Sequence, residues 1–551
     1  MLASASTRAS APQRSCFGCG FDRHGPRHAA PCPAPARNGA RACLVAPARV
    51  MDGARPLVPE TVRPTVRLDA PVADQGLQAP GQHLDQVSVV MKFGGSSVAN
   101  AERLREVASI VCSFPDHLPC VVLSAMGKTT NLLLQAGEEA LHTPAGEVGA
   151  LAPLAAIRDL HLATAAELGV DAQAVRGVET LLTQLEQLLV GISIMQDLTH
   201  RARDSLVSFG ERLSTRLFAA YLRAQGVPAR QHDAFDIGVI TTDVFTSAEV
   251  DYEASLPALR EALRLPGSGG PRPLPIVTGF LGRGRGSGAI TTLGRGGSDL
   301  TCTLLGAALG LPEVQVWKDV DGVLTSDPRI IPAARPVAQL TFEEATELAF
   351  FGATVLHPQA MQPAQEVGGM GVRVKNSYNR LAPGTLISAE RDMADALCTA
   401  IVLKSNVTMV DISSTRMLGQ YGFLARVFDV FARQKLSVDV VATSEISVSL
   451  TLDPARTLWE RDLIEDELEG LMAAFAGIAK ASYRRGMSII CLICNVQRTS
   501  TILERVFNVL GREAVNVQMM SQGASKTNIS LIVRDGEAPR AVAALHAEFF
   551  E

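Results

Sequence analysis

The sequence predicts an α/β fold with a mostly parallel sheet covered by helices, followed by a repeated α+β unit. From about residue 87, apolar runs alternate with glycine turns and helical segments, which is typical of a parallel sheet covered on both faces. The last 150 or so residues contain two similar stretches about 80 residues apart, a period that suits a small domain rather than a solenoid unit. The chain of 551 residues, 47% hydrophobic, exceeds what a single core holds.

The strand candidates are apolar runs followed by glycine-bearing turns: 87–93, 120–126, 274–282 and 314–320. The segment VANAERLREVASIVCSF after the first run reads as a helix, and GSGGPRP (267–273) reads as a loop. Thr341 is followed three residues later by Glu344, a capping-box signature that predicts the start of a helix.

The two similar stretches, 426–450 and 505–531, each read strand, helix, strand, strand, helix. The second copy lacks the final strand that the first copy has around 478–485. A missing strand leaves an open sheet edge that another segment must cover, so we expect the two copies to be structurally interdependent. The predicted boundaries are a leader at 1–86, an α/β domain at 87–390, and α+β domains at 398–485 and 486–551.

The first 51 residues contain seven arginines, no lysine and one acid, Asp22, and are rich in Ala, Ser and Pro. This composition is typical of an organellar transit peptide; a disordered tail is the alternative, and a mitochondrial destination would suit the same composition. Residues 1–86 carry ten arginines and six acids against a total charge of -5, so the rest of the chain is acidic. It has no basic stripe for nucleic acid.

Ten cysteines in a chain of this length are no disulfide framework, so we expect reduced thiols. Cys491 and Cys494 have CxxC spacing, but they lie in the apolar run SIICLICN, where residues three apart on a strand point to opposite faces. Packing is therefore favoured over redox or zinc chemistry. No uninterrupted apolar run approaches the roughly 20 residues of a membrane span, so we expect no membrane partner.

The segment KFGGSSV (92–98) follows a strand and supplies a flexible turn with free N–H groups beside Lys92. These features suit a transferable phosphate, and a purely structural turn is the alternative. The segment MGKTT (126–130) is no Walker A loop, because the first glycine of that motif would have to replace Val122.

In TTLGRGGSDLT (291–301), Arg295, Ser298 and Asp299 surround paired glycines before an apolar helix. A guanidinium, a hydroxyl, a carboxylate and helix-terminal amides in one place suit a zwitterionic amino acid.

Two further segments add charged candidates. Lys318 and Asp319 come at the carboxyl end of a predicted strand, where α/β ligand sites form. Glu211, in SFGERLST (208–215), is either a ligand-binding acid or an exposed helical one.

Together with the repeat, six segments occur in the order seen in aspartokinases, and the match covers residues 88–551. They are KFGGSSV, VVLSAMGKTTN, SFGERLST, TTLGRGGSDLT, WKDVDGVLTSDPR and FGATVLHP. The chain resembles the monofunctional, lysine-sensitive plant and algal type, because it ends after the repeats without a homoserine dehydrogenase domain. The resemblance implies an amino-acid kinase (carbamate kinase-like) sandwich followed by two ACT (ferredoxin-like) domains.

The resemblance implies that ATP, with Mg²⁺, phosphorylates the β-carboxylate of L-aspartate to 4-phospho-L-aspartate, the first step of lysine, threonine and methionine biosynthesis. This carboxylate is already ionised at pH 7, so no general base is required. The implied nucleotide contacts are Lys92, Gly94, Gly95, Ser96, Ser124, Lys318 and Asp319.

Arg295 would pair with the substrate α-carboxylate, and Glu211 and Asp299 would hold its amino group. The implied substrate-binding set is Thr130, Glu211, Arg295, Ser298 and Asp299, and the implied catalytic set is Lys92, Arg295 and Asp299, with no protein metal site. Leu324 and Thr354 depart from an aromatic residue and a lysine of some bacterial members, so contacts there stay open.

By similarity to lysine-inhibited members, the first repeat would bind an effector amino acid, with lysine expected. The implied pocket residues are Met417, Gln420, Phe423, Leu424, Val438, Asp439, Ser444 and Glu445. In the second copy the two acids become Gln518 and Ala524, so a structural role is expected there. Threonine is the rival effector and S-adenosylmethionine a possible second ligand.

Several alternatives stay open. The repeat could be a plain dimerisation module, and a homodimer or larger assembly through the ACT domains is expected. The enzyme could act on another carboxylate, such as acetylglutamate, or the chain could be a catalytically silent amino-acid sensor. The expected location is the plastid stroma, after transit-peptide removal.

Overall fold

The computed structural model describes residues 77–264, 272–353, 356–393, 396–414, 421–434, 436–444, 446–452, 465–523 and 525–551. Several residues named above lie outside these ranges: residues 1–76 of the predicted leader, most of the predicted loop at 267–273, Thr354, Met417, Gln420, Glu445 and Ala524.

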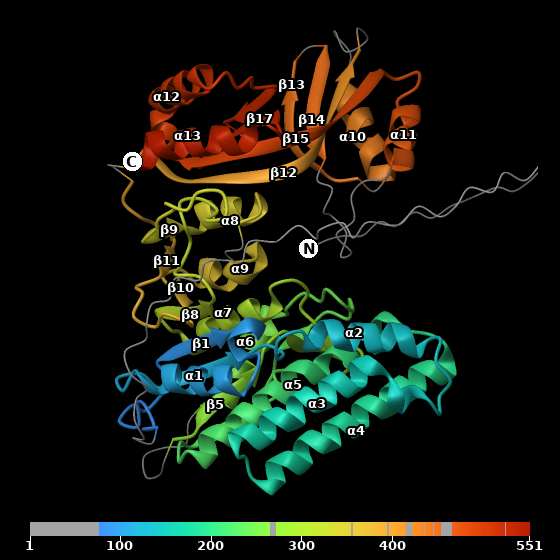
Figure 1. Cartoon of the computed structure of the whole chain (residues 1–551), viewed down its shortest axis with the longest axis vertical. Helices are drawn as coiled ribbons and strands as arrows, with labels where there is room; N and C mark the ends of the chain where they lie inside the picture. The colour runs from blue at the N-terminus through green and yellow to red at the C-terminus, as the bar shows by residue number, and fades with distance from the viewer. Residues whose placement is uncertain are drawn as a thin grey trace, which may run out of the picture. The chain divides into compact units, whose positions relative to one another are not determined.

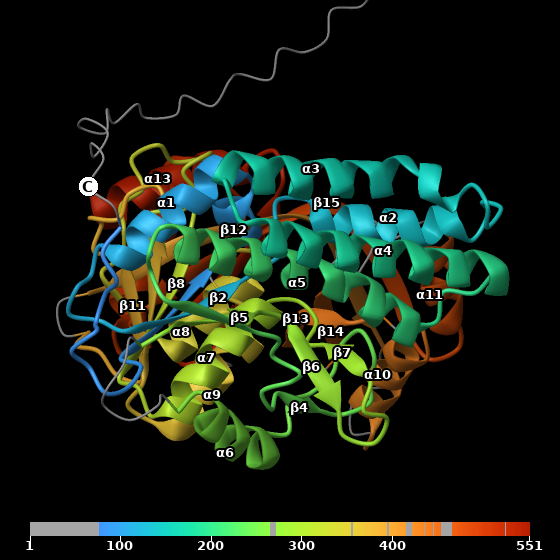
Figure 2. The same ribbon diagram turned by 90° about the horizontal axis from the view of Figure 1, so that it is seen from below.

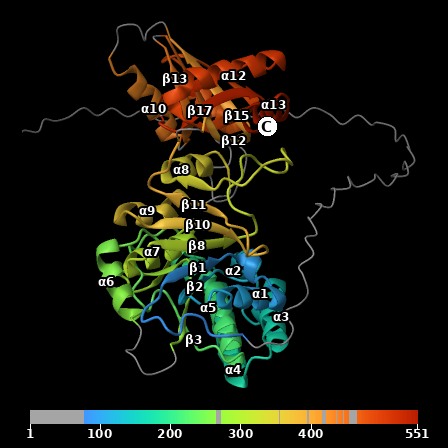
Figure 3. The same cartoon turned by 90° about the vertical axis from the view of Figure 1, so that its left-hand side faces the viewer.

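An eight-stranded sheet forms the centre of the first domain, and its neighbouring strands can be followed in Figure 3. All strand pairs in it are parallel except β10 with β11, so the prediction of a mostly parallel sheet is confirmed. In sheet order the strands are β3 (Ala229–His232), β5 (Leu274–Thr278), β2 (Pro119–Leu123), β1 (Val89–Phe93), β8 (Glu313–Lys318), β10 (Gly371–Asn376), β11 (Thr385–Ser388) and β9 (Gln339–Thr341).

Helices cover both faces of this sheet, because successive side chains of its strands point to opposite sides. On β1, Val89, Met91 and Phe93 join one core, and Val90 joins the other. The first core contains α1 (Ala101–Cys112), α2 (Thr129–Ala140), α3 (Ala152–Leu168), α4 (Ala172–Met195) and α5 (His200–Ala224). The second contains α6 (Tyr252–Ala262), α7 (Gly297–Leu309), α8 (Phe342–Phe350) and α9 (Pro358–Val367).

Figure 2 shows α2, α3, α4 and α5 packed as neighbours. Helix α4 is long and apolar enough, by length and composition alone, to cross a membrane. Its residues Val178, Leu185, Leu189 and Ile192 are buried in the core instead, which is the usual place of an apolar helix in a globular domain.

The prediction of one strand at 274–282 is wrong. The chain leaves β5 at Thr278 and enters β6 (Leu281–Gly284), which belongs to a separate three-stranded sheet with β4 (Ile240–Thr241) and β7 (Ile290–Thr292). Phe280 lies between the two strands with φ 70°, a left-handed conformation that no strand continues through. The predicted capping box at Thr341 and Glu344 is confirmed.

The two repeat copies share one six-stranded sheet, ordered β13, β14, β12, β15, β17, β16. Its long strands β12 (Cys398–Ser413) and β15 (Lys480–Cys494) lie side by side in Figure 1. The remaining elements are α10 (Phe423–Arg433), β13 (Val438–Thr443), β14 (Ser447–Leu452), α11 (Glu465–Ala474), α12 (Thr499–Arg512), β16 (Met519–Gln522), β17 (Asn528–Arg534) and α13 (Ala538–Phe550).

The two halves of β12 pair with strands of different copies. Residues 408–413 pair with β14 of the first copy. Residues 398–404 pair with the half of β15 that also pairs with β17 of the second copy. The strand missing from the second copy is therefore supplied by the start of the first copy, and the expected interdependence is confirmed. On β15, Cys491 and Cys494 join different cores, and burial raises the pKa of both thiols, that of Cys494 to about 12.

We predict that Ile401→Ala destabilises the second copy although it lies at the start of the first, because Ile401 is buried in the core of α12 and α13. The expected loss is about 2 to 5 kcal/mol. Amide hydrogen exchange should show weaker protection in α12 and α13. The matched control is Ile412→Ala, which sits in the core of α10 and α11 and should weaken protection there instead. The same pattern from both variants would contradict the division.

Candidate active site

A cavity of about 390 Å³ lies where β1 and β2 end and α7 begins. Turns that follow neighbouring parallel strands meet at the same sheet edge, which is where α/β ligand sites form. The predicted residues that line this cavity are Lys92, Gly95, Ser124, Thr130, Glu211, Ser298 and Asp299.

A buried ion pair spans the cavity. The Nζ of Lys92, from β1, lies 2.5 Å from Oδ1 of Asp299, in the first turn of α7, and both side chains are under a tenth exposed. Burial alone would raise the pKa of Asp299, but Lys92 and Lys318 together hold it below its usual range. Asp299 is therefore a carboxylate at neutral pH and fixes the ammonium of Lys92.

The turns after β1 and β2 pack directly on each other. The amide of Gly127 donates to the carbonyl of Gly95 over 3.0 Å, and that of Ser124 donates to the carbonyl of Phe93 over 3.2 Å. A Cβ at Gly95 would lie 2.9 Å from the carbonyl oxygen of Ala125, so only glycine allows this approach. The phosphate turn predicted from KFGGSSV is thus part of the cavity wall.

A second buried network ties this turn to the end of β8. The hydroxyl of Ser97 lies 2.9 Å from that of Ser377, which also accepts from Nη2 of Arg103 over 3.0 Å. The amide of Ser377 donates to the carbonyl of Lys318 over 2.7 Å. Ser377 therefore links two segments predicted to contact the nucleotide.

Glu211, on α5, is buried and points one carboxylate oxygen at the amide of Ala125, 3.2 Å away. Its other oxygen, Oε2, is buried without a hydrogen-bond partner among the described residues. Burial raises the pKa of Glu211 to about 8, although the Ala125 hydrogen bond and the charge of Lys92 oppose that shift. The sequence left open an exposed helical position for Glu211. The side chain is instead buried and lines the cavity.

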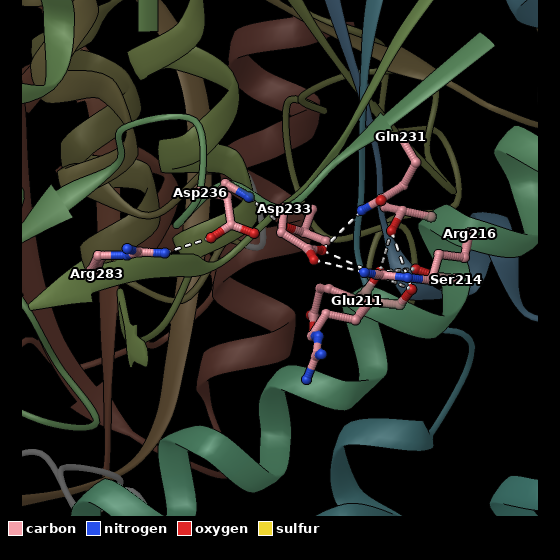
Figure 4. A network of polar contacts seen from close by, with 11 residues as sticks. Glu211, Ser214, Arg216, Gln231, Asp233, Asp236 and Arg283 are labelled. Carbon is pink, nitrogen blue, oxygen red and sulfur yellow. Dashed lines mark hydrogen bonds and ion pairs between the residues drawn. The ribbon is translucent and has the colours of Figure 1, made fainter. Parts of the chain in front are cut away.

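Figure 4 shows how α5 is held in place beyond Glu211. The hydroxyl of Ser214 donates to the carbonyl of Ser124 over 2.8 Å, which fixes the turn after β2. Arg216 pairs with Asp233 over 2.8 and 3.1 Å, and Gln231 donates to the same carboxylate. A bidentate arginine pair of this kind sets orientation as well as distance.

Not every predicted residue lines the cavity. Arg295, Ser96 and Asp319 are exposed, and Lys318 is half-buried beside Asp299 and Lys92, which influence its pKa. Burial and the charge of Lys92 lower the pKa of Lys318, although the charge of Asp299 opposes that shift. Gly94 lies next to Lys92, since a Cβ there would be 3.7 Å from Nζ.

Some residues of the site were not singled out from the sequence. His357 follows the FGATVL segment and packs against Gly296, where a Cβ would lie 2.4 Å from that of His357. Gly296 has φ 72°, so glycine suits it on both counts. Burial and the nearby charge of Arg295 lower the pKa of His357. The other cavity residues are Ala125, Gly127, Asn131, Phe280, Gly294 and Gly297.

The predicted effector residues are only partly described. Phe423 is buried, Leu424 and Ser444 are exposed, and Val438 is half-buried. Asp439 has a fully buried side chain and pairs with Nζ of Lys404, 2.9 Å away. Lys404 also lies 5.3 Å from the ring centre of Phe350, at the end of α8. Asp439 thus already holds an ammonium group of the chain itself.

Comparison with known proteins agrees with this architecture. The amino acid kinase family model matches residues 88–376, and an ACT domain model matches residues 490–549. Aspartokinase 1, chloroplastic, of Arabidopsis thaliana is 58% identical over 465 residues, which cover 84% of this chain and 80% of that protein.

Two crystal structures of Escherichia coli aspartokinase III are also similar. The complex with lysine and aspartate (T-state) has a TM-score of 0.69 at 34% identity, and the complex with aspartate and ADP (R-state) has 0.69 at 35%. Each comparison covers 84% of this chain and 100% of the other. On its sequence and its fold together, this chain belongs to the aspartokinase family.

Proposed function

We propose that this protein transfers the γ-phosphoryl group of ATP to the β-carboxylate of L-aspartate, giving 4-phospho-L-aspartate, the first step towards lysine, threonine and methionine. The observation that carries the proposal is the buried Lys92–Asp299 pair, which faces one cavity together with Glu211. Related proteins crystallised with aspartate and with ADP support the same substrates. The plastid stroma is the proposed location, supported by the chloroplastic relative.

In the proposed reaction, cationic groups of the site bind the anionic groups of the substrates, and an acidic group binds the substrate ammonium. Lys92 and the amides of the Gly94–Ser96 turn neutralise charge on the migrating phosphoryl group, and the β-carboxylate attacks without a base because it is already ionised. The substrate ammonium needs an anion beside it, and Glu211 offers a buried oxygen without a partner among the described residues. The guanidinium of Arg295 binds the α-carboxylate through two parallel hydrogen bonds.

Mg²⁺ suits this site as an ion carried by the nucleotide. Among the described residues no group of three or more His, Cys, Asp or Glu side chains could hold a metal, and Mg²⁺ in kinases needs only one or two protein carboxylates beside phosphate oxygens. Asp299, which pairs with Lys92, and Asp319, which follows Lys318, offer carboxylates beside the proposed nucleotide contacts. When bound, the ion would neutralise phosphate charge.

The test of the proposed function is an ATP-dependent hydroxamate assay with aspartate, acetylglutamate or no acceptor. Hydroxylamine traps an acyl phosphate as a stable hydroxamate, so product with aspartate alone is expected. Product only with acetylglutamate would identify a different carboxylate kinase. No product with either acceptor from the folded protein would favour a silent sensor.

The first prediction concerns Lys92. Lys92→Met keeps the aliphatic stem but removes the charge, and turnover should fall by about a hundredfold or more. The variant should also melt at a lower temperature, because Asp299 keeps a buried charge without its lysine. The double variant Lys92→Met/Asp299→Asn is the control: it should regain stability but not activity. A single variant that kept more than a tenth of wild-type turnover would contradict the role of Lys92.

The second prediction concerns pH. Because the pKa of Glu211 is raised to about 8, the side chain is neutral below that pH and a carboxylate above it. Only the carboxylate pairs with the substrate ammonium, so kcat/KM for aspartate should rise with pH and level off above about 8. Glu211→Gln should lower kcat/KM and abolish the rise, whereas kcat/KM for ATP at saturating aspartate should not follow the same curve. An unchanged pH profile in Glu211→Gln would assign the titration elsewhere.

The third prediction concerns feedback inhibition by lysine, which we place at the first ACT copy. Asp439 holds Lys404, so an effector ammonium that binds Asp439 has to replace the ammonium of Lys404. Lys404 also lies 5.3 Å from the ring centre of Phe350, seven residues before His357, which packs against Gly296 in the cavity wall. Displacement of Lys404 is therefore a physical link from effector to active site, and the link needs a coupling free energy of only about 1 to 3 kcal/mol.

Two substitutions should act in opposite directions. Asp439→Asn should raise the inhibitory lysine concentration at least about tenfold, because an ammonium loses its carboxylate. Lys404→Met should lower that concentration, because the competing ammonium is gone. Inhibition series with lysine, threonine and S-adenosylmethionine, singly and in pairs, measure both effects. Shifts of the same sign in the two variants would contradict the competition, and inhibition by threonine alone would contradict lysine as effector.

A further inference from the structure

A second buried carboxylate, outside the cavity, joins the two segments that carry the proposed aspartate-binding charges. Asp204 lies near the start of α5 and is 1% exposed. Its Oδ2 accepts from the amides of Thr246 and Thr292 over 2.9 and 3.0 Å. Its Oδ1 accepts from the amide of Thr246 over 3.1 Å and from the hydroxyl of Thr292 over 2.8 Å.

Thr292 and the helix that carries Asp204 both lead directly to the site. Thr292 ends β7, three residues before Arg295, and Ser298 and Asp299 follow on the same turn. Asp204 itself lies seven residues before Glu211 on α5, two helical turns away and therefore on the same side of the helix. One carboxylate thus connects the helix that carries Glu211 to the turn that carries Arg295.

The third segment held by Asp204 has an unusual backbone. Thr246 has φ 71°, a left-handed conformation that a β-branched residue adopts only where its surroundings fix it. Its amide is the group that both oxygens of Asp204 accept from. Two residues on, the amide of Ala248 donates to the carbonyl of Thr292 over 2.8 Å. The 246–248 segment is therefore held against the end of β7, beside Gly294.

We propose that Asp204 is a positioning residue for the aspartate-binding half of the site, because it sets the distance between Glu211 and the Arg295 turn. This inference rests on the proposed function. The nucleotide half has its own buried link, Ser377, between the turn after β1 and the end of β8. The hydrogen bonds of Asp204 go to Thr246 and Thr292 and not to this link, so loss of Asp204 should affect aspartate far more than ATP.

The substitution Asp204→Asn removes one of the two accepting oxygens. The amide NH₂ group of the new asparagine would face the donors of Thr246 and Thr292, so at least one buried donor would lose its partner. KM for aspartate should rise by about tenfold or more, while KM for ATP changes by less than about twofold. L-aspartate alone should no longer raise the melting temperature of the variant, whereas ADP alone should still do so.

A milder series keeps the proposal testable if Asp204→Asn fails to fold. Thr292→Val removes only the hydroxyl that donates to Asp204 and should raise KM for aspartate in the same direction. Thr292→Ser keeps the hydroxyl and should restore the wild-type value. The matched control is Thr291→Val, one residue away on β7. It removes another buried hydroxyl, which lies 2.6 Å from that of Thr241, and should lower stability without changing KM for aspartate.

The reciprocal control is Ser377→Ala, which should raise KM for ATP and leave KM for aspartate unchanged. Two outcomes would overturn the positioning role and indicate a general loss of rigidity instead. One is an equal rise of KM for aspartate and KM for ATP in Thr292→Val, and the other is an equal rise of KM for aspartate in Thr291→Val and Thr292→Val. Wild-type protein that gives no hydroxamate and no melting shift with L-aspartate would instead overturn the proposed function itself. The two failures are therefore distinguishable.

Discussion

The arrangement of the active site depends on the ion pair between Lys92 and Asp299. Neither charge could stay buried alone, because the desolvation of an isolated ion is too costly. Lys92 comes from β1, one of the two middle strands of the sheet, and Asp299 comes from a helix on one of its faces. Because each charge requires the other, the turn after Lys92 and the turn that contains Arg295 and Ser298 meet at a single cavity. The same pair holds the Nζ of Lys92 in place before any substrate arrives.

Such a site works by alignment rather than by proton transfer. The acceptor carboxylate is ionised in water, so the protein has to overcome repulsion between two anions and hold them in line. In the proposed function, Lys92 and Arg295 provide positive charge for the anions, and the buried Oε2 of Glu211 accepts the substrate ammonium. Buried links at Ser377 and Asp204, outside the reacting groups, keep these charges at fixed separations. The six-stranded sheet of the repeat contains a comparable ion pair, between Lys404 and Asp439.

The features of the molecule that the sequence predicted have local signals. A strand followed by a glycine turn predicted the phosphate turn, and polar residues around paired glycines before an apolar helix predicted the substrate turn. The capping box at Thr341 was equally local. The parts that sequence could not predict depend on partners far along the chain. The Asp204–Thr292 and Lys404–Asp439 contacts, the left-handed Phe280 that ends β5, and the split use of β12 have no local pattern.

The central claim, that a substrate carboxylate oxygen itself attacks the γ-phosphorus, can be measured by isotope transfer. Aspartate labelled with oxygen-18 in both β-carboxylate oxygens is incubated with enzyme, ATP and hydroxylamine. Hydroxylamine attacks the acyl carbon and releases phosphate together with the bridging oxygen. If the carboxylate attacks, each released phosphate carries one oxygen-18 atom, detected by the isotope shift in phosphorus NMR. Phosphate without the label, formed at the rate of ATP consumption, would mean that water rather than aspartate is the acceptor and would contradict the account.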